Sequence, residues 1–168
     1  MDAADIAEVH IETWRATYAG LIPDAYLVGQ SKERREASWR ELIGRRRRAT
    51  TLVVELPERR VIGFGDCGPT RDRQLPYSGE VYTLYVLPDW QNQGIGRRLL
   101  TGLFEELAAK GAHSAFLWVL SRNPTRFFYE AMGGEPVAER QENFAGATLD
   151  ETAYAWPDLN GWLITARQ

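Results

Sequence analysis

The segment from Gln91 to Arg98 restricts the fold of this chain more than any other part of the sequence. It stands between a stretch with β-strand character, Glu80–Val86, and a helical stretch from about Gly94 to Lys110 whose apolar residues repeat at helical spacing. A nearly all-apolar stretch, Ser114–Leu120, follows the helix. Strand, helix and strand in this order predict a parallel βαβ unit, because parallel neighbours need a crossover connection.

Helical and β-rich stretches also flank this unit. We expect further helices over 5–18, 31–44 and 124–132, and further strands over 51–55, 60–66, 137–144 and 149–156. No repeat, linker or low-complexity segment interrupts them, so residues 1–168 are expected to form one domain. Turn residues between the paired β-rich stretches indicate antiparallel hairpins. The chain is therefore expected to be α+β, with a mixed, mostly antiparallel sheet around a central parallel βαβ unit.

The turn at the start of the long helix has the chemistry of an anion site. Gly94 and Gly96 allow a tight turn and a close approach of the backbone to a ligand. The first N–H groups of the helix lack internal partners, and the helix dipole is positive at this end. Arg97 and Arg98 add positive charge, which is unfavourable at this end unless an anion such as a diphosphate is bound.

Two other phosphate-binding motifs do not fit this turn. A P-loop requires the spacing Gly-x-x-x-x-Gly-Lys-Ser/Thr, which is absent. A dinucleotide-binding turn would have a third glycine at the position of Leu99.

Charge, cysteine content and hydropathy narrow the classes of function. A net charge of −3 gives no general attraction to nucleic acid, and we interpret the basic run Arg45–Arg48 as a solvated loop, with docking of an anion or an acidic partner as the alternative. The single Cys67 cannot form a disulfide within the chain, and no apolar run reaches the ~20 residues that span a membrane. We therefore expect a cytoplasmic protein. Because His10 and His113 are far apart and lack ligand spacing, we expect no metal site.

The central motif resembles a known family. Gln91–Gly96 matches the Gln/Arg-x-x-Gly-x-Gly/Ala signature of the GNAT acetyltransferases, and Asn123-Pro124 with Phe128–Gly134 resembles the family's Asn…Phe-Tyr-Glu-x-x-Gly segment. The resemblance covers residues 50–156, and Tyr18–Pro23 also looks like the opening of one bacterial branch. It implies the GNAT fold, with helices on both faces of the sheet. It also implies an enzyme that moves an acetyl group from acetyl-coenzyme A directly to a primary amine.

The resemblance assigns the contacts to the cofactor. The backbone of Leu84, Tyr85 and Val86 is expected to pair with the pantetheine arm, and the Val86 N–H group to polarise the thioester carbonyl. Asn123 and Arg126 are expected near the pantetheine or the adenosine, although a solvent-facing position is an equal alternative for Arg126. The turn and first helical turn that should hold the pyrophosphate comprise Gln91, Asn92, Gln93, Gly94, Ile95, Gly96, Arg97 and Arg98.

The resemblance also suggests the catalytic groups. Tyr129 matches the family's tyrosine that protonates the departing thiolate, and a half-buried core tyrosine is the alternative. Glu80 stands where some members have a base, while others use water, and a solvated carboxylate at the start of a strand is the alternative. We expect alternate residues of this strand to share one face, namely Glu80, Tyr82, Leu84 and Val86. Trp14, Tyr18 and Tyr26 are candidate walls of the acceptor pocket, and core packing explains them equally.

Other classes of function stay open at this point. A fold of this kind could bind acyl-coenzyme A without turnover, as a regulatory module, and the donor could carry a longer acyl group than acetyl. The acceptor could be a small-molecule amine or the amine of a peptide. The resemblance also gives an expectation of a homodimer, and it gives none of a nucleic-acid partner.

Overall fold

A computed structural model describes residues 3–45 and 48–166 of the chain. The basic run Arg45–Arg48 falls at the gap, so its two central arginines lie outside the described residues. The first half contains α1 (Ala3–Thr17), α2 (Asp24–Val28), α3 (Lys32–Arg45), β1 (Thr50–Glu55), β2 (Val61–Pro69) and β3 (Gly79–Val86). The second half contains a short 3-10 turn (Pro88–Trp90), α4 (Ile95–Ala109), β4 (Ala115–Leu120), α5 (Arg126–Ala131), β5 (Glu135–Phe144), β6 (Ala147–Trp156) and α6 (Leu159–Ala166).

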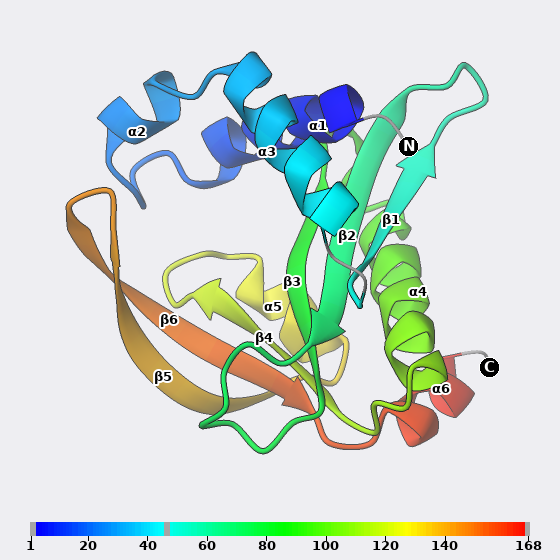
Figure 1. The fold of residues 1–168 in the computed structure, drawn as a ribbon. Coiled ribbons are helices and arrows are strands. Elements are labelled where there is room, and N and C mark those ends of the chain that lie inside the picture. Colours follow the sequence, from blue (N-terminus) through cyan, green and yellow to red (C-terminus); the bar gives the residue numbers. More distant parts are fainter. Residues whose placement is uncertain (1–2, 46–47, 167–168) are drawn as a thin grey trace.

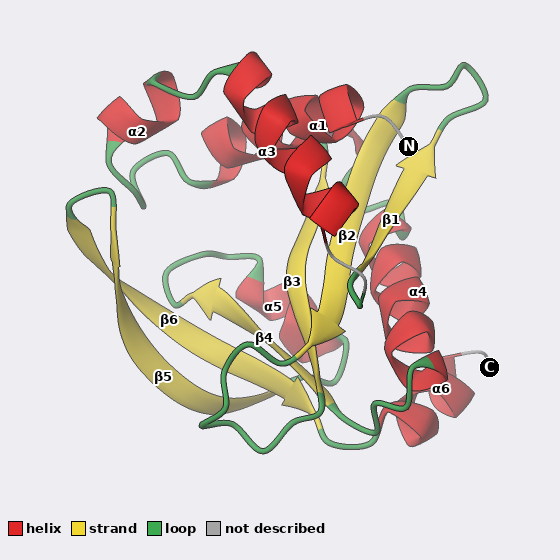
Figure 2. Cartoon of the chain, in the orientation of Figure 1, coloured by secondary structure: helices red, strands yellow, loops and turns green. Residues whose placement is uncertain are grey.

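In the described residues, six strands form one sheet in the order β1-β2-β3-β4-β6-β5. Every neighbouring pair is antiparallel except β3 and β4, which are joined by the crossover helix α4. The mixed sheet with a central parallel βαβ unit is therefore confirmed (Figure 2). Two helices were not expected: α2, a five-residue helix behind Pro23, and α6, whose sequence contains Gly161.

Helices cover both faces of the sheet, as predicted. Phe64 of β2 packs edge-to-face on Trp39 of α3, at 5.1 Å between ring centroids. A Cβ atom on the neighbouring Gly65 would lie 2.6 Å from Leu103 of α4. Because successive residues of a strand point to opposite faces, α3 and α4 lie on opposite sides of β2. Glycine at position 65 lets α4 approach the sheet closely.

The parallel pair β3 and β4 is joined only at its beginning. The paired residues are Gly79 with Ala115 and Glu80 with Phe116. Beyond them the two strands diverge, so that β3 runs toward α1 while β4 runs toward the β5–β6 hairpin (Figure 1). The sheet therefore has a V-shaped opening at its centre, with Glu80 near the vertex.

The face alternation expected along β3 is wrong, because the strand contains a bulge. In the pairing with β2, Asp66 faces Thr83 and Cys67 faces Val81, so Tyr82 is an extra residue. Below the bulge, Val81 packs in the apolar cluster under α4. Above it, Leu84 packs against the same cluster. Glu80 and Leu84 therefore point to opposite faces of the sheet.

Within the described residues, no helix combines the length and the apolar character needed to cross a membrane.

Candidate active site

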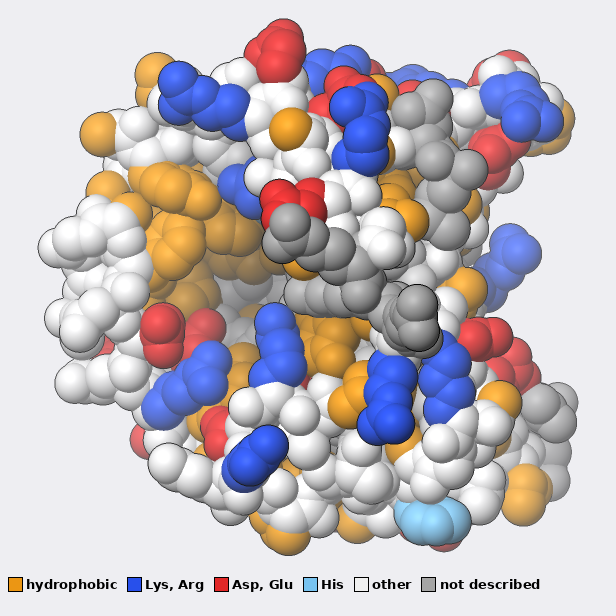
Figure 3. All heavy atoms as spheres, in the orientation of Figure 1, with side chains coloured by type: hydrophobic (Ala, Val, Ile, Leu, Met, Phe, Trp, Pro, Cys, Tyr) orange, Lys and Arg blue, Asp and Glu red, His pale blue; other side chains and the backbone are white. Residues whose placement is uncertain are grey.

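The opening between β3 and β4 holds a large cavity. Its volume is about 960 Å³, and residues 81–86 of β3 and 117–120 of β4 form its two sides. The end of α1, the start of α4, α5 and the β5–β6 hairpin complete the lining. Figure 3 shows the hollow, with hydrophobic side chains at its back and both acidic and basic side chains along its lower edge.

One end of the cavity has the features of a diphosphate site. Asn92 and Gly94, which line it, both adopt left-handed backbone conformations, with φ of 59° and 78°. Glycine and asparagine tolerate this region better than other residues. Among the described residues no side chain caps α4, and the first turn of this helix contains no acidic residue. The free N–H groups and the positive end of the helix dipole therefore face the cavity without competition, which fits a diphosphate.

Backbone polar groups on the side of β3 that faces β4 are also available to a ligand. Leu87 donates its N–H to the Ile62 carbonyl of β2, at 2.9 Å, so the next residue back, Val86, presents its backbone polar groups away from β2. The Val86 carbonyl accepts a hydrogen bond from Gln91 Nε2 at 2.9 Å. Gln91 thus links the open strand edge to the turn before α4, and an extended ligand can lie along both.

The cofactor residues predicted from the sequence divide into two groups. Those that line the cavity are Leu84, Tyr85, Val86, Gln91, Asn92, Gly94, Gly96, Arg97 and Asn123. Those outside its lining are Gln93, Ile95, Arg98 and Arg126. Gln93 donates instead to the Asp89 carbonyl at 3.0 Å, Ile95 is buried, and Arg126 lies over the ring of Phe127.

Helix α5, which contains Tyr129, lies beside the start of α4. The ring of Phe128 lies so near Gly96 that a Cβ atom at that position would be 3.3 Å from it. Asn123, which is buried, accepts the Thr125 N–H through Oδ1 at 2.9 Å and shapes the turn that precedes α5. The glycine turn and the Phe-Tyr-Glu segment, which are distant in the sequence, therefore form one wall of the cavity.

Three tyrosines, Tyr18, Tyr85 and Tyr129, lie close together in the lining of the cavity. Tyr129 packs in the apolar cluster under α4, whereas Tyr85 packs on His10 of α1, at 5.3 Å between ring centroids. Burial, and then the phenol of Tyr85, raise the pKa of Tyr129. Burial also raises the pKa of Tyr18, with smaller contributions from Tyr85 and Tyr129. All three phenols therefore keep their protons at neutral pH.

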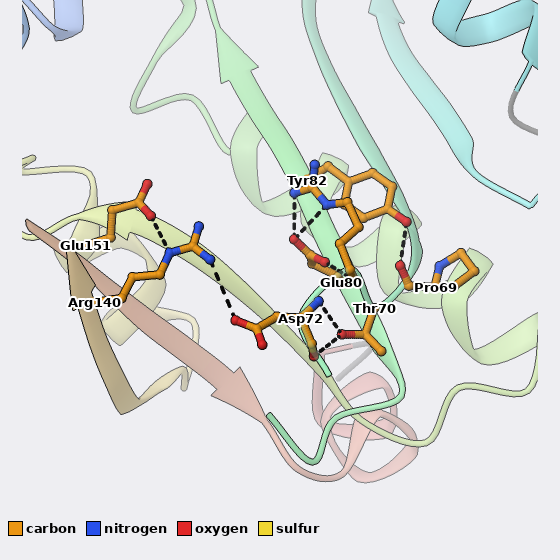
Figure 4. Close-up of polar contacts among 8 residues, drawn as sticks. Pro69, Thr70, Asp72, Glu80, Tyr82, Arg140 and Glu151 are labelled. Carbon is orange, nitrogen blue, oxygen red and sulfur yellow. Dashed lines mark hydrogen bonds and ion pairs between the residues drawn. The ribbon is translucent and has the colours of Figure 1, made fainter. Parts of the chain in front are cut away.

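Glu80 is held by the loop that precedes β3 (Figure 4). Its side chain is only 3% exposed and does not line the cavity. Arg71 donates to Glu80 Oε1 through Nε at 3.0 Å and Nη2 at 2.6 Å, and its backbone N–H donates to Oε2 at 2.7 Å. Both carboxylate oxygens are therefore engaged by a residue that itself lines the cavity.

The predicted acceptor walls are only partly in contact with the cavity. Trp14 and Tyr18 line it, with 4.8 Å between their ring centroids. Tyr26 is not in the lining and packs behind the wall, 4.7 Å from the ring of Phe144. Phe144 comes from the tip of the β5–β6 hairpin and was not anticipated, although it lines the cavity opposite α1.

The hairpin also contributes charged residues that sequence analysis missed. Arg140 donates to Glu151 at 2.7 Å and lies 3.6 Å from a carboxylate oxygen of Asp72 (Figure 4). Its guanidinium also lies over the ring of Trp118. Glu142 and Glu151 line the same cavity. No sequence motif marks these residues, because only the strand order brings β5 and β6 beside β4.

His10 has a structural position in the core. It is 5% exposed, and its Nδ1 accepts a hydrogen bond from Trp39 Nε1 at 3.2 Å. Burial, and then the nearby Arg35, lower the pKa of His10 to about 3. The imidazole is therefore neutral in the folded protein.

Comparisons with known proteins agree with this geometry. Residues 9–133 match the model of the acetyltransferase (GNAT) family. The chain is 39% identical to the Bacillus subtilis protein YuaI, an uncharacterized N-acetyltransferase, over 95% of this chain and 90% of YuaI. Among solved structures, the fold resembles YncA, a putative acetyltransferase from Salmonella typhimurium with its cofactor acetyl-CoA, at 25% identity and a TM-score of 0.66, over 95% of this chain and 89% of that one. It also resembles the PaiA N-acetyltransferase from Thermoplasma acidophilum in complex with coenzyme A, at 22% identity and a TM-score of 0.63, over 90% of this chain and 91% of that one.

Proposed function

This chain belongs to the acetyltransferase (GNAT) family of acetyl-CoA-dependent enzymes, and we propose that it transfers an acetyl group directly to a primary amine that enters the cavity between β3 and β4. The observation that carries this proposal is the meeting of the uncapped start of α4 with the open edge of β3. Together they offer a site for a diphosphate and a site for an extended arm. Acetyl-CoA supplies the activated acyl group.

Backbone groups are proposed to hold the cofactor. The pyrophosphate binds the first N–H groups of α4 and the side chain of Arg97, which lines the cavity. The pantetheine arm pairs with β3 where this strand has separated from β4. The N–H group of Val86 points into this gap and polarises the carbonyl of the thioester.

Tyr129 is proposed as the general acid. Tyr129 is 6% exposed, lines the cavity and directly follows Phe128, whose ring lies beside Gly96 at the start of α4. Its raised pKa keeps the phenol protonated at neutral pH, so that it can donate a proton or a hydrogen bond to the departing thiolate.

Water is the better candidate for the base than Glu80. A base must reach the ammonium of the acceptor, directly or through one water. Both oxygens of Glu80 are engaged by Arg71, and the side chain does not line the cavity. We propose that the proton leaves through water in the cavity and that Glu80 acts by holding Arg71 in the wall.

A tyrosine pair tests the acid role. In Tyr129→Phe we expect kcat for thiol release with a panel of amines to fall about 100-fold, while the Kd for acetyl-CoA changes little. Tyr154→Phe is the matched control, because the Tyr154 hydroxyl donates to Glu130 at 2.6 Å and the residue does not line the cavity.

The outcomes separate the alternatives. Equal turnover by the Tyr129→Phe variant and the native chain would remove Tyr129 from the mechanism. Binding of acetyl-CoA by the native chain without thiol release from any amine would instead favour a non-catalytic acyl-CoA-binding module.

A further inference from the structure

The β5–β6 hairpin presents a row of side chains to the cavity. Arg140, Glu142 and Phe144 alternate along β5 and all line the cavity, so they share one face of the strand. On β6, Glu151 pairs with Arg140, and Leu149 pairs with Glu142. The row therefore runs from an ion pair near β4, through a single carboxylate, to an aromatic ring at the tip.

Glu142 forms no ion pair in the described part of the chain, unlike Glu80, Glu151 and Asp72 near the same cavity. Arg71 pairs with Glu80, and Arg140 pairs with both Glu151 and Asp72. Across residues 3–45 and 48–166, no ion pair is formed by Glu142, whose side chain is exposed to the cavity. Glu142 is therefore a carboxylate of the cavity lining whose negative charge no ion pair balances in the described part of the chain.

Aromatic rings stand beside this carboxylate. Phe144 is the next residue of the same face, and its ring centroid lies 5.8 Å from that of Trp14. The ring centroids of Trp14 and Tyr18 are in turn 4.8 Å apart. Rings of this kind attract cations through their faces, and more strongly where water is partly excluded.

Helix α1 adds a polar group without a partner. Thr13 lines the cavity, is only 4% exposed, and its Oγ1 has no hydrogen-bond partner in the described part of the chain. A buried hydroxyl without a partner is unfavourable unless a ligand supplies one. Its oxygen can accept a hydrogen bond from an ammonium group.

We propose that Glu142, Phe144, Trp14 and Thr13 form a subsite for a second cationic group of the acceptor, so that the preferred substrates are amines with two positive charges. This inference rests on the proposed acetyl transfer and names its class of acceptor. One amine of the substrate reaches the three tyrosines of the lining, and the other remains charged between the hairpin tip and α1. The unpaired charge of Glu142 and the open hydroxyl of Thr13 are then both satisfied.

A matched pair of amines tests this subsite. Cadaverine and pentylamine have the same carbon chain, and only cadaverine has a second ammonium group. With acetyl-CoA at saturation, we expect kcat/KM for cadaverine to exceed that for pentylamine about tenfold, beyond the twofold statistical factor of two equivalent amines. In Glu142→Gln this ratio should fall to near the statistical factor. Glu139→Gln is the control, because Glu139 is an exposed residue of the opposite face of β5 and should leave the ratio unchanged.

Equilibrium binding of the two amines to the complex with coenzyme A provides a readout that does not depend on turnover. Tighter binding of cadaverine that is lost in Glu142→Gln supports the subsite even if neither amine is acetylated, in which case only the proposed reaction fails. Binding and kcat/KM values for the two amines that differ by no more than the statistical factor would overturn the subsite and leave the acetyl transfer intact. An equal effect of Glu139→Gln would overturn it as well, because general surface charge would then explain the preference.

Discussion

Replacing Arg71 with methionine is expected to destabilise the protein far more than the loss of an ordinary surface ion pair. The Arg71 side chain is 56% exposed, but its partner Glu80 is only 3% exposed. Methionine retains most of the apolar stem and removes the guanidinium, so Glu80 keeps one hydrogen bond, from the backbone N–H of residue 71. A nearly buried carboxylate then lacks its positive partner.

The expected magnitude follows from this asymmetry. Removing one partner of a buried pair costs about 3–5 kcal/mol, whereas exposed pairs contribute roughly 0.2–1 kcal/mol. Because Arg71 is half exposed, we expect the lower end of the first range, about 3 kcal/mol. For a chain of this size, that loss lowers Tm by roughly 6–12 °C.

The assay is a double-mutant cycle with Glu80→Gln, read by chemical denaturation. In the double variant no charge is left without a partner, so we expect it to recover about 2 kcal/mol relative to Arg71→Met alone. Additive effects, or a loss below about 1 kcal/mol in Arg71→Met, would refute the account of Glu80 as a buried charge held by Arg71. The same Glu80→Gln variant should retain kcat within a few-fold. A large loss of kcat that becomes smaller at high pH, where the amine is already neutral, would identify Glu80 as the base.

Two further substitutions test the cofactor turn and the first helix. Gly94→Ala should lower the free energy of unfolding by about 1–2 kcal/mol, because an L-residue is strained at a φ of 78°. Calorimetric titration of this variant should also show weaker acetyl-CoA binding. Unchanged stability and affinity would argue against this turn geometry. The pKa of His10 is about 3 in the folded protein and 6.5 ordinarily, so the unfolded chain takes up a proton first as the pH falls. The contribution of the neutral His10 to stability is therefore fully present above pH 6.5 and is lost as the pH falls from 6.5 toward 3. Between about pH 7 and about pH 5 this loss amounts to roughly 2 kcal/mol, so His10→Gln should reduce the change in the free energy of unfolding over this range by that amount, as measured by chemical denaturation. The same change in the native chain and the variant would contradict the buried neutral imidazole.

The sequence was informative where local patterns determine the structure. The glycine turn, the stripe of α4 and the apolar stretch of β4 predicted the parallel unit, and the structure confirms it. The same turn predicted an anion site, and α4 indeed begins there without a cap among the described residues. These features depend on residues that are neighbours in the chain.

The features that could not be predicted from the sequence depend on contacts between segments that are distant in the chain. The bulge at Tyr82 interrupts the alternation of β3 and appears only in the pairing with β2. The partner of Glu80 comes from a loop with no recognisable motif. Glu142 and Phe144 reach the cavity because β6 inserts between β4 and β5, and strand order cannot be read from the periodicity of single strands. The short α2 provided too few residues for a helical period.

Calorimetric titration of the full chain with acetyl-CoA tests the central claim most directly. We predict saturable binding at one site per chain, with coenzyme A competing for the same site, because the start of α4 and the open edge of β3 fit the parts that the two molecules share. The absence of saturable binding would contradict the cofactor site, and with it the acetyl transfer proposed for the cavity between β3 and β4.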